Sequence, residues 1–127
     1  MNTKDKMFQI ECQSGTLIVT PQSNLGECDF ERIETEATAV LRMLDAGEVK
    51  NVVMDFCDTN YFGSTVLSYF VKIWKRVNEH GGHMAFCNLS PLERETLAIT
   101  HLDHLWSVRD FREEAMAAVD WSQLSST

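Results

Sequence analysis

The stretch from Asn51 to Leu67 constrains the fold of this 127-residue chain more than any other segment. It opens with the continuous apolar run Val52-Val53-Met54, which is typical of a β-strand covered on both faces. It closes where Ser64 and Thr65 begin a long amphipathic helix. This order places the Ser64 hydroxyl at a helix N-terminus, where backbone N–H groups and the helix dipole favour an anion. A serine there caps the helix, carries a phosphate, or does each in turn.

Strand and helix patterns alternate along the rest of the chain. Strands are predicted over 8–12, 16–20, 51–56, 83–87 and 105–108, and helices over 27–46, 64–79, 90–100 and 110–119. Ser14-Gly15 predicts a hairpin between the first two strands, and Gly47 is expected to end the first helix. The order predicts an α/β fold, a mixed β-sheet covered by helices, in a single domain over 1–127 with a core of about 8–120.

Local signals refine the helix starts and the loop before Ser64. Ser90-Pro91-Leu92-Glu93 matches a capping box with proline at the first helical position, and Asp110 to Glu113 predicts a similar start for the last helix. Phe111 is expected in the buried stripe of that helix. Phe62 is expected in the core and Tyr61 at the surface, and Gly63 is expected to supply a positive φ before the helix.

The charge balance limits the classes of partner. Nineteen acidic residues against eleven basic ones give a formal net charge of −8, which argues against nucleic acid and against an anionic membrane surface. A cationic protein partner fits this charge better. No apolar run is long enough to span a membrane, and the first six residues lack the apolar core of a signal peptide. We therefore expect a cytoplasmic protein.

Several motifs, taken together, resemble the STAS domain family, which includes the anti-sigma factor antagonists and the cytoplasmic domains of sulfate transporters. The family pattern is a strand ending in Asp, a turn, Asp-Ser-Ser-Gly-Leu opening a helix, then Gly-Gly and another strand. Here Val52 to Asp55, Tyr61 to Leu67 and Gly81 to Asn88 stand in that order, and Leu97 to Trp106 resembles a later family segment. The resemblance extends from about Leu17 to about Val119 and implies the STAS fold.

The resemblance also implies a function. Family members of the antagonist type bind an anti-sigma factor that is also a serine-protein kinase, and phosphorylation of the antagonist ends the binding. The acceptor serine of the family maps onto Ser64, with Thr65 as the second choice. The resemblance therefore predicts a protein-interaction module in transcription regulation and signal transduction, and a phosphoprotein.

Two departures from the pattern leave alternatives open. Gly63 stands where the family usually has Asp, and Val66 where it usually has Gly. The first alternative is a phosphorylation-independent STAS scaffold or a small-ligand-binding module. The second is a thiol-based sensor or an enzyme that uses Cys57 and Cys87.

In open α/β sheets, binding sites gather beyond the carboxyl ends of the strands. The predicted partner-binding residues follow three strand ends: Ser23, Asn24, Asp58, Asn60, Tyr61, Gly63, Ser64, Thr65, Asn88 and Ser90.

We expect no catalytic site, no cofactor and no metal. Asp55 and Asp58 lack a glycine-rich phosphate loop and a partner lysine, so they are assigned to turns and caps. The histidine pairs His80/His83 and His101/His104 have no further ligands nearby in the sequence. The cysteines Cys12, Cys28, Cys57 and Cys87 form no Cys-x-x-Cys motif and are expected as free thiols, with Cys57 and Cys87 packed in the core.

Overall fold

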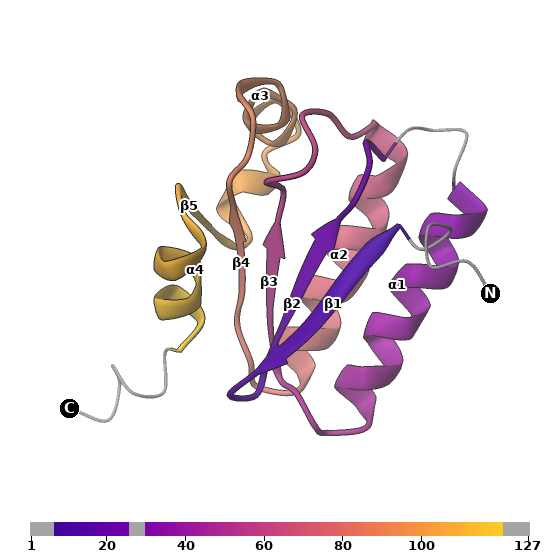
Figure 1. Cartoon of the computed structure of the whole chain (residues 1–127), viewed down its shortest axis with the longest axis vertical. Helices are drawn as coiled ribbons and strands as arrows, with labels where there is room; N and C mark the ends of the chain where they lie inside the picture. The colour runs from indigo at the N-terminus through magenta and orange to yellow at the C-terminus, as the bar shows by residue number, and fades with distance from the viewer. Residues whose placement is uncertain (1–6, 26–29, 121–127) are drawn as a thin grey trace.

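The computed structural model describes residues 7–25 and 30–120, in which five strands form one mixed sheet (Figure 1). The strands lie side by side in the order β1 (Phe8–Gln13), β2 (Thr16–Pro21), β3 (Asn51–Asp55), β4 (Met84–Cys87) and β5 (Ser107–Arg109). β1 and β2 form the predicted antiparallel hairpin, and the other neighbours pair in parallel. The mixed α/β sheet predicted from the sequence is therefore confirmed. The predicted start of the first helix near Glu27 lies outside the described residues, as does Cys28.

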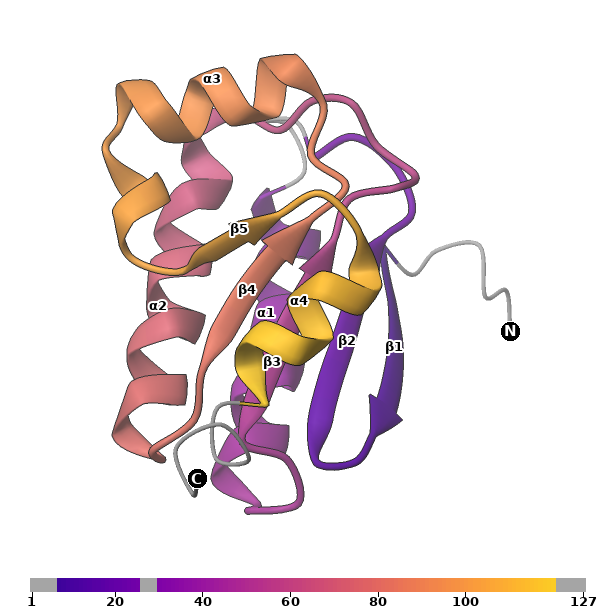
Figure 2. The ribbon, with the colours of Figure 1, turned by 90° about the vertical axis from the view of Figure 1, so that its left-hand side faces the viewer.

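Helices cover both faces of this sheet. α1 (Phe30–Asp45) and α2 (Ser64–Glu79) lie on one face, and α4 (Arg112–Val119) lies on the other (Figure 2). α3 (Pro91–Ile99) lies across the carboxyl end of the sheet and is followed by the short 3-10 turn η3 (Leu102–His104). Within the described residues, no helix has both the length and the apolarity that crossing a bilayer requires.

The two-sided cover explains why β3 shows no polar alternation. Val52 and Met54 belong to the large core cluster under α1 and α2, whereas Val53 packs in a smaller cluster with Ala115 and Val119 of α4. Every residue of β3 is buried. Successive side chains of a strand point to opposite faces, so a strand between two helical layers needs apolar residues at each position.

An aromatic cluster fixes the carboxyl end of β3 against α2. The rings of Phe56, Phe62, Phe70 and Phe86 contact one another with centroid separations between 5.2 and 5.8 Å. Trp106 stacks on Phe86 at 4.4 Å. Phe56 and Phe62 stand at the two ends of the loop that joins β3 to α2, residues 56–63, so the core holds both ends of this loop. The prediction that Phe62 is buried and Tyr61 exposed is confirmed.

Three local predictions were wrong. Gly63 has φ −82° instead of a positive φ, because it follows the bridge between Phe62 and Leu25 and its N–H donates to the Leu25 carbonyl. Asp110 does not cap α4: its carboxylate pairs with Arg94, and the N-cap is Phe111, without a side-chain hydrogen bond. Because Phe111 is the N-cap and lies before the first residue of α4, its side chain is exposed and does not join the buried stripe of the helix.

Other boundaries shift by small steps. β4 starts at Met84, one residue after the prediction, and β5 starts at Ser107 because Leu105 still closes the turn of η3 through its N–H to the Leu102 carbonyl. Gly47 has φ +84° after α1, as expected for a residue that ends a helix.

The buried aromatic cluster makes a stability prediction. Phe56→Ala is expected to lower the free energy of unfolding by about 3–5 kcal/mol, because it removes a fully buried ring and leaves a cavity. The matched control Phe111→Ala removes an exposed ring and is expected to change it by less than about 0.5 kcal/mol. Urea unfolding followed by circular dichroism measures both. Equal losses in the two variants would contradict this account of the core.

Candidate functional site

Ser64 is the first residue of α2 and its side chain is exposed. The N-cap of this helix is Gly63, which makes no side-chain hydrogen bond, so capping, one of the roles that the sequence left open for Ser64, is not observed. The Gly63 N–H donates to the Leu25 carbonyl at 2.8 Å, and Gly63 is extended, so the helix starts at Ser64. The Ser64 hydroxyl thus stands in solvent at the N-terminus of a 16-residue helix that has no acidic residue in its first turn.

The N-terminus of α3 holds the β3–α2 loop through a buried carboxylate. Glu93 is fully buried, and its Oε1 accepts the Ser90 N–H at 2.9 Å, as the predicted capping box requires. Its Oε2 accepts the Thr59 hydroxyl at 2.7 Å. The Ser90 hydroxyl, besides capping Glu93, donates to the Asn60 carbonyl at 2.7 Å. A single capping box therefore fixes both its own helix and two residues of the neighbouring loop.

Asn24 holds the same loop from the side of β2. Its side-chain oxygen accepts the Asn60 N–H, and its side-chain amide donates to Asn60 Oδ1, both at 3.0 Å. Gln22 donates to Asp58 at 3.3 Å. An open polar hollow of about 410 Å³ lies over these groups and is lined by Asn24, Cys57, Asp58, Thr59 and Asn60. The loops after β2, β3 and β4 therefore meet as the topology predicts.

Asp55, at the end of β3, joins the site to α4. Its buried carboxylate accepts hydrogen bonds from the Asn88 amide at 2.9 Å, from Arg112 Nε at 2.7 Å and from the Cys57 N–H at 3.0 Å. Burial opposes its ionisation, but these donors outweigh burial and lower the pKa of Asp55 below its usual value. Its role is thus larger than the turn and cap predicted from sequence.

The exposure and the pKa values of Cys57 and Cys87 bear on the hypothesis of a thiol-based sensor or enzyme. Cys87 is buried as predicted, but Cys57 is exposed, because it lies one residue beyond the buried Phe56. Partial burial of the sulfur and the charge of Asp55 raise the pKa of Cys57 to about 11, and the same two causes raise the pKa of Cys87 to about 12. Both sulfurs are thiols rather than thiolates near neutral pH, which makes them poor nucleophiles.

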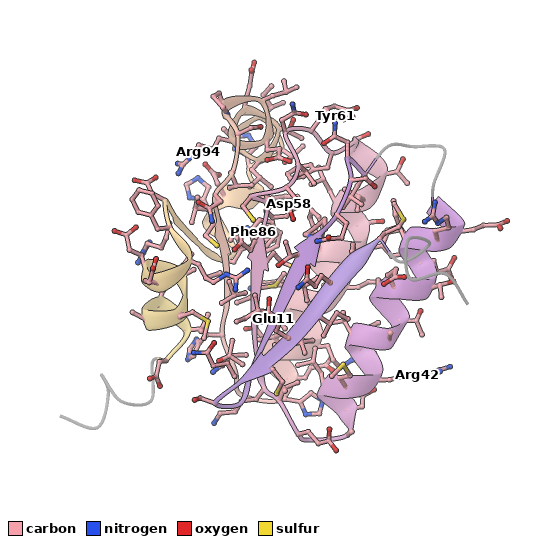
Figure 3. The ribbon with its side chains drawn as sticks, in the orientation of Figure 1. Glu11, Arg42, Asp58, Tyr61, Phe86 and Arg94 are labelled. Atoms are coloured by element: carbon pink, nitrogen blue, oxygen red, sulfur yellow. The ribbon has the colours of Figure 1, made fainter. Side chains whose placement is uncertain are left out.

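The predicted partner-binding residues fall into two groups. Exposed side chains are those of Ser23, Asn24, Asp58, Asn60, Tyr61, Ser64 and Thr65. Gly63 is buried, Ser90 is half-buried, and Asn88 turns its amide toward Asp55. Figure 3 shows Asp58 and Tyr61 on the β3–α2 loop, with Arg94 on α3 toward β5. These residues lie at one edge of the sheet, and their role in binding stays a prediction.

Sequence reasoning missed three residues that shape this edge. Glu93 was recognised only as part of a capping box, and neither Thr59 nor Arg112 was assigned a partner. A capping-box glutamate has one obvious partner, the N-cap N–H, so nothing in the sequence pointed to Thr59, which lies 34 residues earlier. Arg112 is 57 residues from Asp55, and no spacing rule connects them.

Comparison with known proteins identifies the class. The family model of the STAS domain matches residues 7–115, so the chain belongs to the STAS domain family. A protein of Bordetella bronchiseptica, BtrV, assigned as an anti-sigma factor antagonist, is 30% identical over 104 residues that cover 82% of this chain and 86% of BtrV. The resemblance predicted from sequence is confirmed.

Solved structures are similar to the whole fold. TM1081 of Thermotoga maritima, also assigned as an anti-sigma factor antagonist, superposes with a TM-score of 0.80 at 22% identity and covers 94% of this chain and 99% of its own. The Bacillus anti-sigma factor antagonist SpoIIAA, solved unphosphorylated and phosphorylated, gives a TM-score of 0.69 at 17% identity in both forms. Both alignments cover 87% of this chain; they cover 94% of the unphosphorylated structure and 96% of the phosphorylated one. At these identities the likeness shows an anti-sigma-factor-antagonist-like fold.

The Thr59–Glu93 hydrogen bond is expected to stabilise the β3–α2 loop. Thr59→Val keeps the shape of the side chain but leaves Glu93 Oε2 without this donor, so the free energy of unfolding should fall by about 1–3 kcal/mol. The control Thr96→Val removes a hydroxyl that donates only within its own helix, to the Leu92 carbonyl, and should change it by less than about 0.5 kcal/mol. Urea titrations compare the two. A loss in Thr59→Val no larger than in the control would refute the clamp.

The Asp55 network is expected to make stability depend on pH. The pKa of Asp55 is lowered in the folded state, so its ionised form adds stability above the unfolded pKa of about 3.9, and this stability is lost as the pH falls through the folded pKa. At pH 7, Asp55→Asn should therefore cost about 1.5–3 kcal/mol. The gap to the wild type should shrink steadily in urea titrations below pH 4. A gap that stays constant down to pH 2 would contradict the lowered pKa. At pH 7 the exposed control Asp58→Asn should cost less than about 0.5 kcal/mol.

Proposed function

We propose that this protein is a cytoplasmic anti-sigma factor antagonist that binds an anti-sigma factor with serine-protein kinase activity. Unphosphorylated, it holds the anti-sigma factor and frees a sigma factor; phosphorylated at Ser64, it releases the anti-sigma factor. The proposal gives the chain no catalytic step of its own. The observation that carries it is the exposed Ser64 hydroxyl at the start of α2, in a chain of the STAS family.

The position of Ser64 suits a phosphoacceptor. Since Gly63 is the N-cap, the Ser64 hydroxyl makes no capping hydrogen bond that phosphorylation would disrupt. A kinase would form the bond between Ser64 Oγ and the γ-phosphorus of ATP while the bond to ADP breaks, with the hydroxyl proton passing to a base of the kinase. The positive end of the α2 dipole stabilises the resulting charge of about −1.5 to −2.

The same charge would prevent docking. A partner packed over the bare hydroxyl would have to desolvate a dianion, which costs several kcal/mol unless a cation compensates. Each 1.4 kcal/mol is about a factor of ten in affinity, so about 4 kcal/mol is enough for a thousandfold loss. Binding would be lost while the fold survives.

The two departures from the family pattern lie inward. Val66 is buried, so this departure alters packing beneath the helix start rather than the surface that a kinase or a partner meets. Gly63 is also buried, and as the N-cap of α2 it makes no side-chain hydrogen bond. This supports the phosphorylated antagonist over a phosphorylation-independent scaffold or small-ligand module. The raised pKa values of Cys57 and Cys87 give a thiol-based sensor or enzyme no support.

Phosphorylation and binding are tested together. After incubation with the cognate anti-sigma kinase and Mg-ATP, mass spectrometry should find one phosphate, lost in Ser64→Ala and kept in the control Thr65→Ala. Ser64→Asp should bind the kinase at least about tenfold more weakly in calorimetry, because a carboxylate carries part of the charge of a phosphate. The midpoint temperature of its thermal unfolding should be unchanged or slightly higher, since an acid at a helix N-terminus stabilises the helix.

Two results would separate the alternatives. Tight binding without any phosphate on Ser64 or Thr65, and with Ser64→Asp at wild-type affinity, would favour the phosphorylation-independent scaffold. No binding of any anti-sigma factor would overturn the proposal.

A further inference from the structure

The exposed large hydrophobic side chains of the described residues all lie at one end of the molecule. They are Tyr61 (39% exposed), Leu92 (49%), Ile99 (69%) and Phe111 (59%), and we call them the edge patch. Tyr61 is on the β3–α2 loop, Leu92 and Ile99 are on α3, and Phe111 follows β5. Each thus comes after the carboxyl end of a parallel strand, at the end of the sheet that α3 crosses (Figure 1, Figure 2). Single exposed hydrophobic residues are ordinary, but four at one edge mark an interaction surface.

α3 carries the centre of this patch. Its inner face buries Glu93 and Leu97 against the loop and the core. Leu92 and Ile99 lie two helical turns apart, about 10 Å along the axis, and therefore share the outer face. The outer face of a surface helix is normally polar, and here Glu95 and Thr96 share it with two exposed aliphatic side chains that have no partner in the described residues.

Negative charge surrounds the patch. The segments 55–63 and 88–114 hold eight acidic side chains against three arginines, which is five of the eight net negative charges of the whole chain. Six of these acids are exposed, and Asp55 and Glu93 are buried. Arg94 and Arg112 are already paired with Asp110 and Asp55. Arg109 is exposed and donates to a backbone carbonyl.

The acids at the α3 and α4 end of the patch remain available to a partner. Glu95, Glu113 and Glu114 are exposed, and no basic group of the described residues lies within 4.0 Å of any of them. This excess of acid selects a cationic partner.

We propose that the edge patch is the docking surface for the anti-sigma factor, and that the partner presents apolar side chains bordered by lysine and arginine. This inference rests on the proposed function and names the surface beyond Ser64 that gives affinity. Tyr61 lies three residues before Ser64, so the patch reaches the loop that leads into the proposed phosphorylation site.

α2 and α4 lie on opposite faces of the sheet (Figure 1, Figure 2). Partner cations opposite Glu113 and Glu114 would therefore stand on the α4 side of the patch, away from the start of α2. A phosphate on Ser64 would have to be desolvated by the partner surface that covers it, which is the condition for release.

Binding variants test this surface. Leu92→Ser/Ile99→Ser and Phe111→Ser should each weaken binding to the cognate anti-sigma factor at least tenfold, because central apolar anchors dominate interface affinity. Glu113→Lys/Glu114→Lys should slow association at least tenfold. The association rate of the wild type should fall when salt is raised from about 50 to about 300 mM, which shortens the screening length about 2.4-fold. The control Arg42→Ser, exposed on α1, should bind as the wild type.

The outcomes separate the two proposals. All variants replace exposed residues, and circular dichroism with thermal unfolding checks that each is folded. Wild-type binding that is lost in Ser64→Asp but kept in the α3 and Phe111 variants would overturn this inference and leave the proposed function standing. No binding by the wild type would overturn both. Concentration-dependent dimers that Leu92→Ser/Ile99→Ser abolishes in ultracentrifugation would assign the patch to a second copy of this chain and overturn the inference.

Discussion

Parallel pairing of β2, β3, β4 and β5 is the constraint on which the rest of the structure depends. Parallel neighbours cannot be joined by a tight turn, so each connection must run from the carboxyl end of one strand back to the amino end of the next. As a result, the segments after β2, β3, β4 and β5 all begin at one edge. Residues as far apart in the chain as Asn24, Asn60 and Ser90 come within hydrogen-bonding distance there. The first two crossings place α1 and α2 on one face of the sheet, and α4, which follows β5, covers the other face. This two-sided cover accounts for the apolar run of β3.

Two buried carboxylates then convert this meeting of loops into a defined surface. Glu93 gives one oxygen to its own helix and the other to Thr59, whereas Asp55 takes donors from the loop, from Asn88 and from α4. A buried carboxylate is tolerated only when its hydrogen bonds are made, so each acts as an all-or-none link between segments. The β3–α2 loop is thus fixed at both ends by aromatic packing and in its middle by hydrogen bonds, and Ser64 is presented by a loop that has little freedom.

The sequence predicted this fold well because most of its signals are local or periodic. The apolar run 52–54, the stripe of α2, the capping box at Ser90 and the glycine after α1 each specify structure within a few residues. The predictions that failed depended on contacts between distant residues. Asp110 does not cap α4 because Arg94 draws its carboxylate away, and Gly63 is extended because Leu25 offers a carbonyl. Cys57 is exposed because the core ends at Phe56, which no local pattern indicated. The candidate site was located by topology, but its clamps, Thr59–Glu93 and Asp55–Arg112, had no signature in the sequence.

The placement of Ser64 separates the effect of charge on folding from its effect on binding. A negative charge at the first residue of α2 stabilises the helix through its dipole and its unsatisfied N–H groups. The N-cap is Gly63, so the Ser64 side chain is not needed to cap the helix. The same charge is unfavourable to any apolar partner surface that must cover it. Because the first effect stabilises the isolated domain and the second acts only in a complex, the two have opposite signs. A modification at this position can therefore change the occupancy of a partner without a cost in fold stability, whereas a serine deeper in α2, such as Ser68, whose hydroxyl donates to the Thr65 carbonyl, would couple the two.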